Sequence, residues 1–195
     1  MTGLLIAFEG LDQSGKQTQA ERLRDRLTAT ARRVRLLSFP DYTTSIGQEI
    51  GHALRGQRQY AADVMQLLYV ANRYEWKPQI EGERAAGTVL LCDRYLASSI
   101  AYGEAQGLDG GWLRDVQRFL PQPDLTLLLD IAPATSARRK TVDRDAYERD
   151  LALLARVRES YLRQVSATWT RVDADRDREA VAEDVYAAVT ERLRP

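Results

Sequence analysis

The chain of 195 residues is poor in the residue types that disulfides and zinc sites require. Cys92 is the only cysteine and His52 the only histidine, so the chain forms no internal disulfide and offers no zinc site with the usual ligands. No apolar run approaches the roughly 20 residues that span a bilayer. The N-terminal MTGLLIAFEG has no basic stretch ahead of its short apolar run, unlike a secretory signal. We therefore expect a reducing, cytoplasmic compartment.

An excess of charge of one sign is also absent. Lys+Arg and Asp+Glu both number 28, so the formal net charge is zero. Nothing in this balance favours a nucleic-acid polymer or a membrane as a partner. The basic residues are almost all arginine, since Lys16, Lys77 and Lys140 are the only lysines. This scarcity makes the position of Lys16 informative.

Short apolar runs alternate with helical patterns along the chain. The runs predict buried strands over 4–8, 34–39, 89–92, 125–131 and 169–172. Helices are predicted over 17–30, from a cap at Thr43 or Thr44 to 54, over 63–86 with a kink or break at Pro78, and over 96–105, 112–120, 135–140, 147–167 and 179–193. This order predicts the α/β class: a five-stranded parallel sheet sandwiched by helices, in one domain over 1–195. The carboxyl ends of the strands then share one edge, where ligands bind.

Residues 10–16 read G-L-D-Q-S-G-K, between the first predicted strand and a helix. This is the G-x-x-x-x-G-K pattern of a phosphate-binding loop. Its glycines let backbone N–H groups turn toward an anion, and Lys16 reaches the β- and γ-phosphates. A structural turn is the alternative interpretation, but the strand–helix context argues against it. We expect ATP to bind here, at Gly10, Leu11, Asp12, Gln13, Ser14, Gly15, Lys16, Gln17 and Thr18.

The residue after Lys16 departs from this pattern. A Ser or Thr whose hydroxyl binds Mg²⁺ usually stands there, whereas this chain has Gln17, with Thr18 one place later. Mg²⁺ prefers oxygen ligands and keeps several waters. We therefore expect Gln17 to contact the metal weakly or through water, and carboxylates elsewhere to hold it.

Signatures of other phosphate-loop classes are missing. The guanine-reading N-K-x-D of GTPases cannot occur, because Asn72 is the only asparagine and Arg73 follows it. The transporter-type sequence LSGGQ does not occur either. A small-molecule kinase suits a chain of this length better.

Further motifs, in chain order, resemble the thymidylate kinase family of nucleoside monophosphate kinases. They are F-E-G-L-D-Q-S-G-K-Q-T-Q at 8–19, F-P at 39–40, A-N-R at 71–73, C-D-R-Y-L-A-S-S-I-A-Y at 92–102, L-P-Q-P-D-L-T-L-L-L-D at 120–130, D-R-D-A-Y-E-R-D at 143–150 and V-D-A at 172–174. The resemblance covers nearly the whole chain. It implies Mg²⁺-dependent transfer of the terminal phosphoryl group of ATP to dTMP in dTTP biosynthesis, a homodimer, and a short lid over about 137–148.

The same resemblance implies an acceptor site. Asp12 would lie near the sugar 3′-hydroxyl, Arg73 would donate to a thymine carbonyl, and Tyr69, one helical turn earlier, would stack on the base. Ser99 would bind the pyrimidine edge, and Tyr102 would exclude a ribose 2′-hydroxyl. The expected dTMP-binding set is Asp12, Phe39, Pro40, Tyr42, Tyr69, Arg73, Arg94, Ser98, Ser99, Tyr102 and Tyr147.

Two residues after the third strand have a chemical rationale of their own. The carboxylate of Asp93 can hold Mg²⁺ through water, and with Glu148 and Gln17 it makes up the expected metal set. Arg94 can clamp the acceptor phosphate through two hydrogen bonds. Tyr42 is a departure, because some family members have an Arg at this place that touches that phosphate.

The basic cluster over 137–150 has two interpretations. The interpretation without a catalytic role is a solvated helix face. Some family members, however, carry an Arg where Gln13 stands, and others supply catalytic arginines from the lid. Because Gln13 is neutral, we expect cations of the lid to neutralise the charge on the transferred phosphoryl group; these are Arg138, Arg139, Lys140 and Arg144. Arg139 is expected at the adenine or at a phosphate. The inner edge of the lid is expected to consist of Arg144, Tyr147 and Glu148. The expected catalytic set is Lys16, Asp12, Arg94, Arg139 and Arg144.

The sequence leaves alternative functions open. One is a kinase of dUMP, another deoxynucleotide or a deoxynucleoside. Another is a nucleotide-binding regulatory protein with weak turnover, which Gln17 suggests and which the intact Asp12, Lys16, Asp93 and Arg94 argue against. Selectivity between dTMP and dUMP depends on a pocket for one methyl group, worth only about 1–3 kcal/mol.

Overall fold

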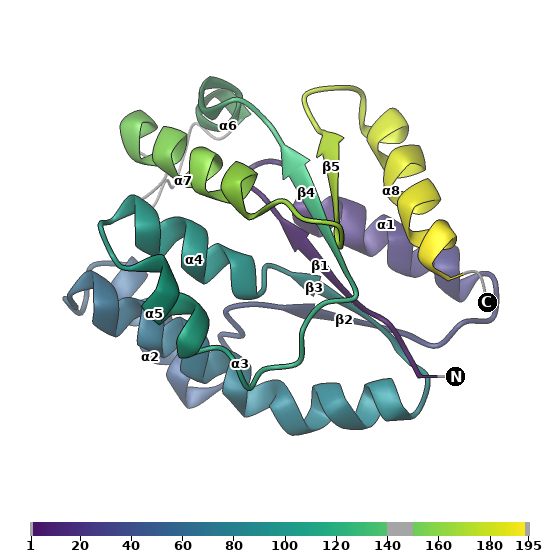
Figure 1. Cartoon of the computed structure of the whole chain (residues 1–195), viewed down its shortest axis with the longest axis horizontal. Helices are drawn as coiled ribbons and strands as arrows, with labels where there is room; N and C mark the ends of the chain where they lie inside the picture. The colour runs from purple at the N-terminus through teal and green to yellow at the C-terminus, as the bar shows by residue number, and fades with distance from the viewer. Residues whose placement is uncertain (1, 140–149, 194–195) are drawn as a thin grey trace.

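The computed structural model describes residues 2–139 and 150–193. Five strands form one sheet in the order β2-β3-β1-β4-β5 (Figure 1), and each neighbouring pair is parallel. They are β1 Leu5–Glu9, β2 Val34–Ser38, β3 Val89–Asp93, β4 Leu125–Asp130 and β5 Trp169–Asp173. The predicted α/β class and five-stranded parallel sheet are confirmed.

Helices cover both faces of this sheet (Figure 1). They are α1 Lys16–Thr28, α2 Ser45–Leu54, α3 Ala62–Ala85, α4 Leu96–Ala105, α5 Gly110–Asp115, α6 Pro133–Arg139, α7 Leu151–Gln164 and α8 Arg178–Arg192. On one side α1 lies beside α8, and on the other α4 packs along α7, with α3 next to β3 (Figure 1). Within the described ranges, no helix is both long and apolar enough to cross a membrane.

The strands are apolar because the central ones are buried from both sides. All five residues of β1 are buried, and successive side chains point to opposite faces. Phe8 packs in the cluster that holds Leu23 of α1, whereas Ala7 packs in the cluster that holds Ile80 of α3. Packing on both faces holds β1 in place, and so determines where the loop that follows it begins.

Register places the functional segments side by side. Phe8 of β1 pairs with Asp93 of β3, so the phosphate loop and the D-R-Y segment leave the sheet next to each other. The N–H of Arg94 donates to the carbonyl of Phe8 at 2.9 Å. The carboxyl edge of the sheet therefore carries both motifs, as predicted.

Three helix predictions need correction. A single helix, α3, runs through Pro78, so a break there is wrong; burial of Val70 and Ile80 on either side offsets the lost hydrogen bond of the proline. The helix predicted over 112–120 is the shorter α5, capped by Asp109, whose side chain accepts from the N–H of Trp112. α7 ends at Gln164 rather than at 167. Thr44 is confirmed as the cap of α2, since its hydroxyl accepts from Gly47 N–H at 3.0 Å.

Candidate active site

The predicted ATP-binding residues 10–18 form the turn between β1 and α1 and the first residues of that helix. Gly10 and Gly15 have φ angles of 137° and 91°, a region where side chains are strained. A Cβ on Gly10 would also lie 2.4 Å from the carbonyl oxygen of Leu129, so glycine is required. The loop ends at the N-terminus of α1, whose free N–H groups and partial positive charge favour phosphate.

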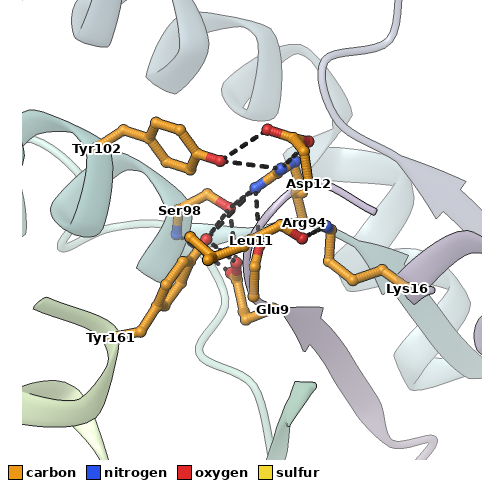
Figure 2. A network of polar contacts seen from close by, with 9 residues as sticks. Glu9, Leu11, Asp12, Lys16, Arg94, Ser98, Tyr102 and Tyr161 are labelled. Atoms are coloured by element: carbon orange, nitrogen blue, oxygen red, sulfur yellow. Dashed lines mark hydrogen bonds and ion pairs between the residues drawn. The ribbon is translucent and has the colours of Figure 1, made fainter. Parts of the chain in front are cut away.

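Lys16 lies inside this turn, with only 6% of its surface exposed. Its Nζ donates to the carbonyl of Leu11 at 2.7 Å (Figure 2). Burial, with the nearby charge of Arg94, lowers the pKa of Lys16 to about 8, because the ammonium has lost its water. An entering phosphate would compensate for that loss, so the group is prepared to bind an anion.

Asp12, Arg94 and Tyr102 form a compact polar group beside the loop (Figure 2). Arg94 makes an ion pair with Asp12, and the Tyr102 hydroxyl donates to the other oxygen of that carboxylate at 2.9 Å. Burial alone would raise the pKa of Asp12, but Arg94 and Lys16 outweigh it and hold that pKa well below its usual range. Asp12 therefore stays ionised and accepts hydrogen bonds beside the phosphate loop.

The backbone of Arg94 is itself unusual. Its φ is 63°, a left-handed conformation that costs a residue with a side chain about 1–3 kcal/mol. The guanidinium Nη1 donates to the Ser98 hydroxyl at 3.1 Å and to the Tyr161 hydroxyl at 3.4 Å. These contacts hold the side chain over the phosphate loop despite the strain, and strain of this kind concentrates at functional sites.

Glu9, the fully buried last residue of β1, is a site residue that the sequence prediction missed. Its Oε1 accepts the N–H groups of Tyr95 at 2.9 Å and Ser98 at 3.3 Å. Its Oε2 accepts the hydroxyls of Ser98 at 2.6 Å and Tyr161 at 3.1 Å (Figure 2). One carboxylate thus joins β1, the start of α4 and the last turn of α7. A carboxylate ending an apolar strand, next to the loop, was the signal that could have found it.

Replacing Glu9 with glutamine is expected to lower the free energy of unfolding by about 2 kcal/mol. The amide NH₂ would face donors that it cannot accept from, which leaves buried groups unpaired. Urea unfolding followed by circular dichroism measures the effect. Glu179→Gln is the matched control, because this carboxylate is exposed and pairs with Arg22 at the surface, where the loss of an ion pair changes stability little. Equal losses in the two variants would contradict the role given to Glu9.

A pocket opens beside the Asp12–Arg94 pair. It is lined by Asp12, Phe39, Pro40, Tyr42, Leu54, Gln66, Tyr69, Arg73, Arg94, Ser98, Ser99 and Tyr102. Every described member of the predicted dTMP-binding set lines it, and Tyr147 lies outside the described residues. Leu54 and Gln66 were not predicted. We call this space the acceptor pocket.

Arg73 forms one wall of the acceptor pocket and is almost fully buried. Its Nη1 donates to the Ser99 hydroxyl at 2.8 Å and to Oε1 of Gln117 at 3.2 Å. Burial lowers the pKa of this guanidinium. Its Nε has no hydrogen-bond partner within 2–139 and 150–193. The group is therefore oriented by α4 and by the turn after α5. Tyr42, by contrast, is half exposed.

The predicted metal residues are only partly described, since Glu148 lies outside the described residues. Oδ1 of Asp93 is buried and has no hydrogen-bond partner in the described part of the chain. The Gln17 amide donates to Glu21 at 3.0 Å on the exposed side of α1. No three His, Cys, Asp or Glu residues gather into a metal site among residues 2–139 and 150–193. A carboxylate whose Oδ1 has no partner among the described residues, beside a phosphate loop, fits Mg²⁺, which uses one or two carboxylates, phosphates and water.

Arg139 is the predicted lid arginine that the structure brings to the loop. Its Nη1 donates to the carbonyl of Gln13 at 3.2 Å and its Nη2 to that of Ala174 at 3.0 Å. Arg138 turns to Thr135 instead, at 3.4 Å. Arg144 lies outside the described residues. The end of α6 thus brings a cation to the phosphate loop at Gln13.

Comparison with known proteins agrees with this geometry. The family model described as thymidylate kinase matches residues 8–185. Thymidylate kinases of Schizosaccharomyces pombe and Homo sapiens are 40% and 32% identical to this chain, over 75% and 98% of its length and 70% and 92% of their own. The solved thymidylate kinase of Candida albicans superposes with a TM-score of 0.85 at 29% identity, covering 98% of this chain and 93% of that one. The chain therefore belongs to the thymidylate kinase family.

Proposed function

We propose that this chain transfers the terminal phosphoryl group of ATP to dTMP, giving ADP and dTDP, with ATP over the phosphate loop and dTMP in the acceptor pocket. One observation carries this proposal: the Asp12–Arg94 pair belongs to both the loop edge and the pocket lining. A phosphate held by Arg94 thus lies next to one held by Lys16. Phosphoryl transfer depends mainly on such positioning and on neutralising charge.

On the acceptor side each group has a task that suits its chemistry. Arg73 donates to a carbonyl of the base, and Tyr69, one turn earlier on α3, covers the ring face. Asp12 accepts from the sugar 3′-hydroxyl, and Tyr102 fills the space of a 2′-hydroxyl. Arg94 clamps the acceptor phosphate, a planar bidentate task for a guanidinium.

On the donor side the charge is met by Lys16, by the N-terminus of α1 and by the lid. The proposed lid covers about 137–148, with Arg139 against the loop. Asp93, with Glu148 and weakly Gln17, would hold Mg²⁺ through water. When bound, this ion neutralises the phosphate oxygens of ATP. The phosphates themselves are nucleophile and electrophile, so no strong general base is required.

We further propose a homodimer and a cytoplasmic location. Val64 and Leu67 lie three residues apart on α3 and are both exposed, which gives this helix an apolar stripe that a second copy of the chain would cover. Sedimentation equilibrium of the purified protein gives the mass and tests the dimer.

Arg73→Ala is expected to raise the KM for dTMP by about 10- to 100-fold, the range for a lost hydrogen bond to a charged group, and Tyr69→Ala to raise it in the same direction. The KM for ATP stays near the wild-type value, because neither side chain borders the phosphate loop. A coupled assay for ADP with dTMP, dUMP, other monophosphates and deoxynucleosides measures this. Arg118→Ala, which removes an arginine that lies over Phe119 outside the pocket, is the control. Equal changes for both substrates, or a better acceptor than dTMP, would contradict the assignment.

A further inference from the structure

The side-chain amide of Gln66 forms no hydrogen bond with any residue that the structure describes. It lies on α3 with 1% of its surface exposed, and it lines the acceptor pocket. Neither Oε1 nor Nε2 has a hydrogen-bond partner among the described residues. Buried amides are nearly always paired, so this side chain is available to a ligand of the pocket.

The place of Gln66 on α3 assigns it to the base rather than to the phosphate. Gln66, Tyr69 and Arg73 are spaced at i, i+3 and i+7, so they project from one stripe of the helix. The Gln66 Cγ packs where α4 comes close, 3.4 Å from the position of a Cβ on Gly103. Ser99, bonded to Arg73 at 2.8 Å, is one turn earlier on α4. Gln66 and the Arg73–Ser99 pair thus lie at two ends of one wall.

An amide offers a donor and an acceptor side by side in one plane. The imide edge of a pyrimidine dione offers the complementary pair, an N3–H beside a carbonyl oxygen. Phosphate oxygens can use only the donor, and a single hydroxyl meets both groups only through two strongly bent, and therefore weak, hydrogen bonds. We propose that Gln66 binds the imide edge of the base, with N3–H donating to its Oε1 and a neighbouring carbonyl accepting from its Nε2. This inference rests on the proposed binding of dTMP in the acceptor pocket.

Gln66 and Arg73 then divide the reading of the base between them. After a half-turn about its Cγ–Cδ bond, the Gln66 amide could bind cytosine equally well. Its oxygen would accept from the amino group, and its NH₂ would donate to the ring nitrogen. Arg73 can only donate hydrogen bonds. It can therefore bind a carbonyl oxygen of the base but not an amino group. Gln66 accordingly supplies affinity for the base edge, and Arg73 supplies the choice between the two patterns.

The test compares Gln66→Met with Gln19→Met. Gln19 is also a buried helical glutamine, and its Oε1 has no hydrogen-bond partner in the part of the chain that the structure describes. It lies on α1, however, and its Nε2 donates to the carbonyl of Arg178 at 3.0 Å. Gln66→Met is expected to raise the KM for dTMP about tenfold, the size of two lost neutral hydrogen bonds, with the KM for ATP unchanged. The thermal midpoint of the ligand-free variant stays level or rises, because an unpaired buried amide is removed. Gln19→Met leaves the KM for dTMP unchanged and lowers the midpoint.

A second probe is dTMP methylated at N3, which has no N3–H to donate. Wild-type enzyme is expected to discriminate strongly against it, and Gln66→Met to lose most of that discrimination. The proposal is overturned by a KM for dTMP within roughly twofold of wild type, by equal rises for ATP and dTMP, or by unchanged discrimination against the methylated base. Failure of the proposed function is distinguishable, since wild-type enzyme would then form no ADP in response to dTMP.

Discussion

Replacing Lys16 with methionine is expected to lower turnover by a factor of about 10²–10³, the cost of losing one preorganised charge at the transition state. The ammonium lies within the phosphate loop and donates to the carbonyl of Leu11 at 2.7 Å. Methionine keeps most of the buried stem and removes the cation. Steady-state turnover at saturating ATP and dTMP measures the loss.

The fold of this variant should survive. Burial lowers the pKa of Lys16 to about 8, which means that the folded protein disfavours the charged form. Removing that charge therefore does not lower the thermal midpoint by much. Lys77→Met is the matched control, since this lysine pairs with Glu81 at the surface and its loss should leave turnover unchanged. Turnover of Lys16→Met within roughly threefold of wild type would reject the phosphate-loop assignment.

Neutralising Arg138, Arg139 and Arg144 together, each to glutamine, is expected to lower turnover by ~10³ or more, the size of arginine-finger removal. Gln13 leaves the loop without a cation at this position, so the lid has to supply one. Arg139 already contacts the Gln13 carbonyl at 3.2 Å. The affinity for dTMP alone should hardly change, because it depends on the acceptor pocket. Turnover and dTMP titration by calorimetry separate the two effects.

Adding Gln13→Arg to the triple variant should restore part of the rate. Gln13 has a φ of 61°, close to the 63° that Arg94 adopts, so an arginine meets no backbone strain there that glutamine does not. Gln13→Asn is the control, because asparagine tolerates this conformation and brings no charge. If the triple variant turns over at a near-normal rate, the basic cluster is a solvated helix face and nothing more.

The sequence predicted well where one local pattern determines the structure. A five-residue apolar strand followed by G-x-x-x-x-G-K allows one geometry, and the structure has it, with Gly10 and Gly15 in the conformations that glycine permits. Parallel topology then brings the D-R-Y segment to the same edge. The acceptor pocket followed from motif resemblance, and its described members all line one space.

Contacts between residues far apart in the sequence were not predicted. Glu9 is defined by partners such as Tyr161, 152 residues away in sequence, and no spacing rule connects the two. Gln66 shares a helix stripe with Tyr69, but only packing against α4 shows that its amide is buried and has no hydrogen-bond partner among residues 2–139 and 150–193. Pro78 ends many isolated helices, yet tertiary burial carries α3 past it. In each case packing between elements overrides the local preference.

The carboxylate of Glu9 has a mechanical consequence. It belongs to the strand that carries the donor loop, and it holds the first turn of α4, which carries acceptor groups, through the N–H groups of Tyr95 and Ser98. The segment that carries the donor loop and the helix that carries acceptor groups are therefore attached to the same carboxylate. The distance between them, which the phosphoryl group crosses, is thus set by the fold. Substrate binding then fills a gap of preset width, and adjustment falls to the side chains that border it.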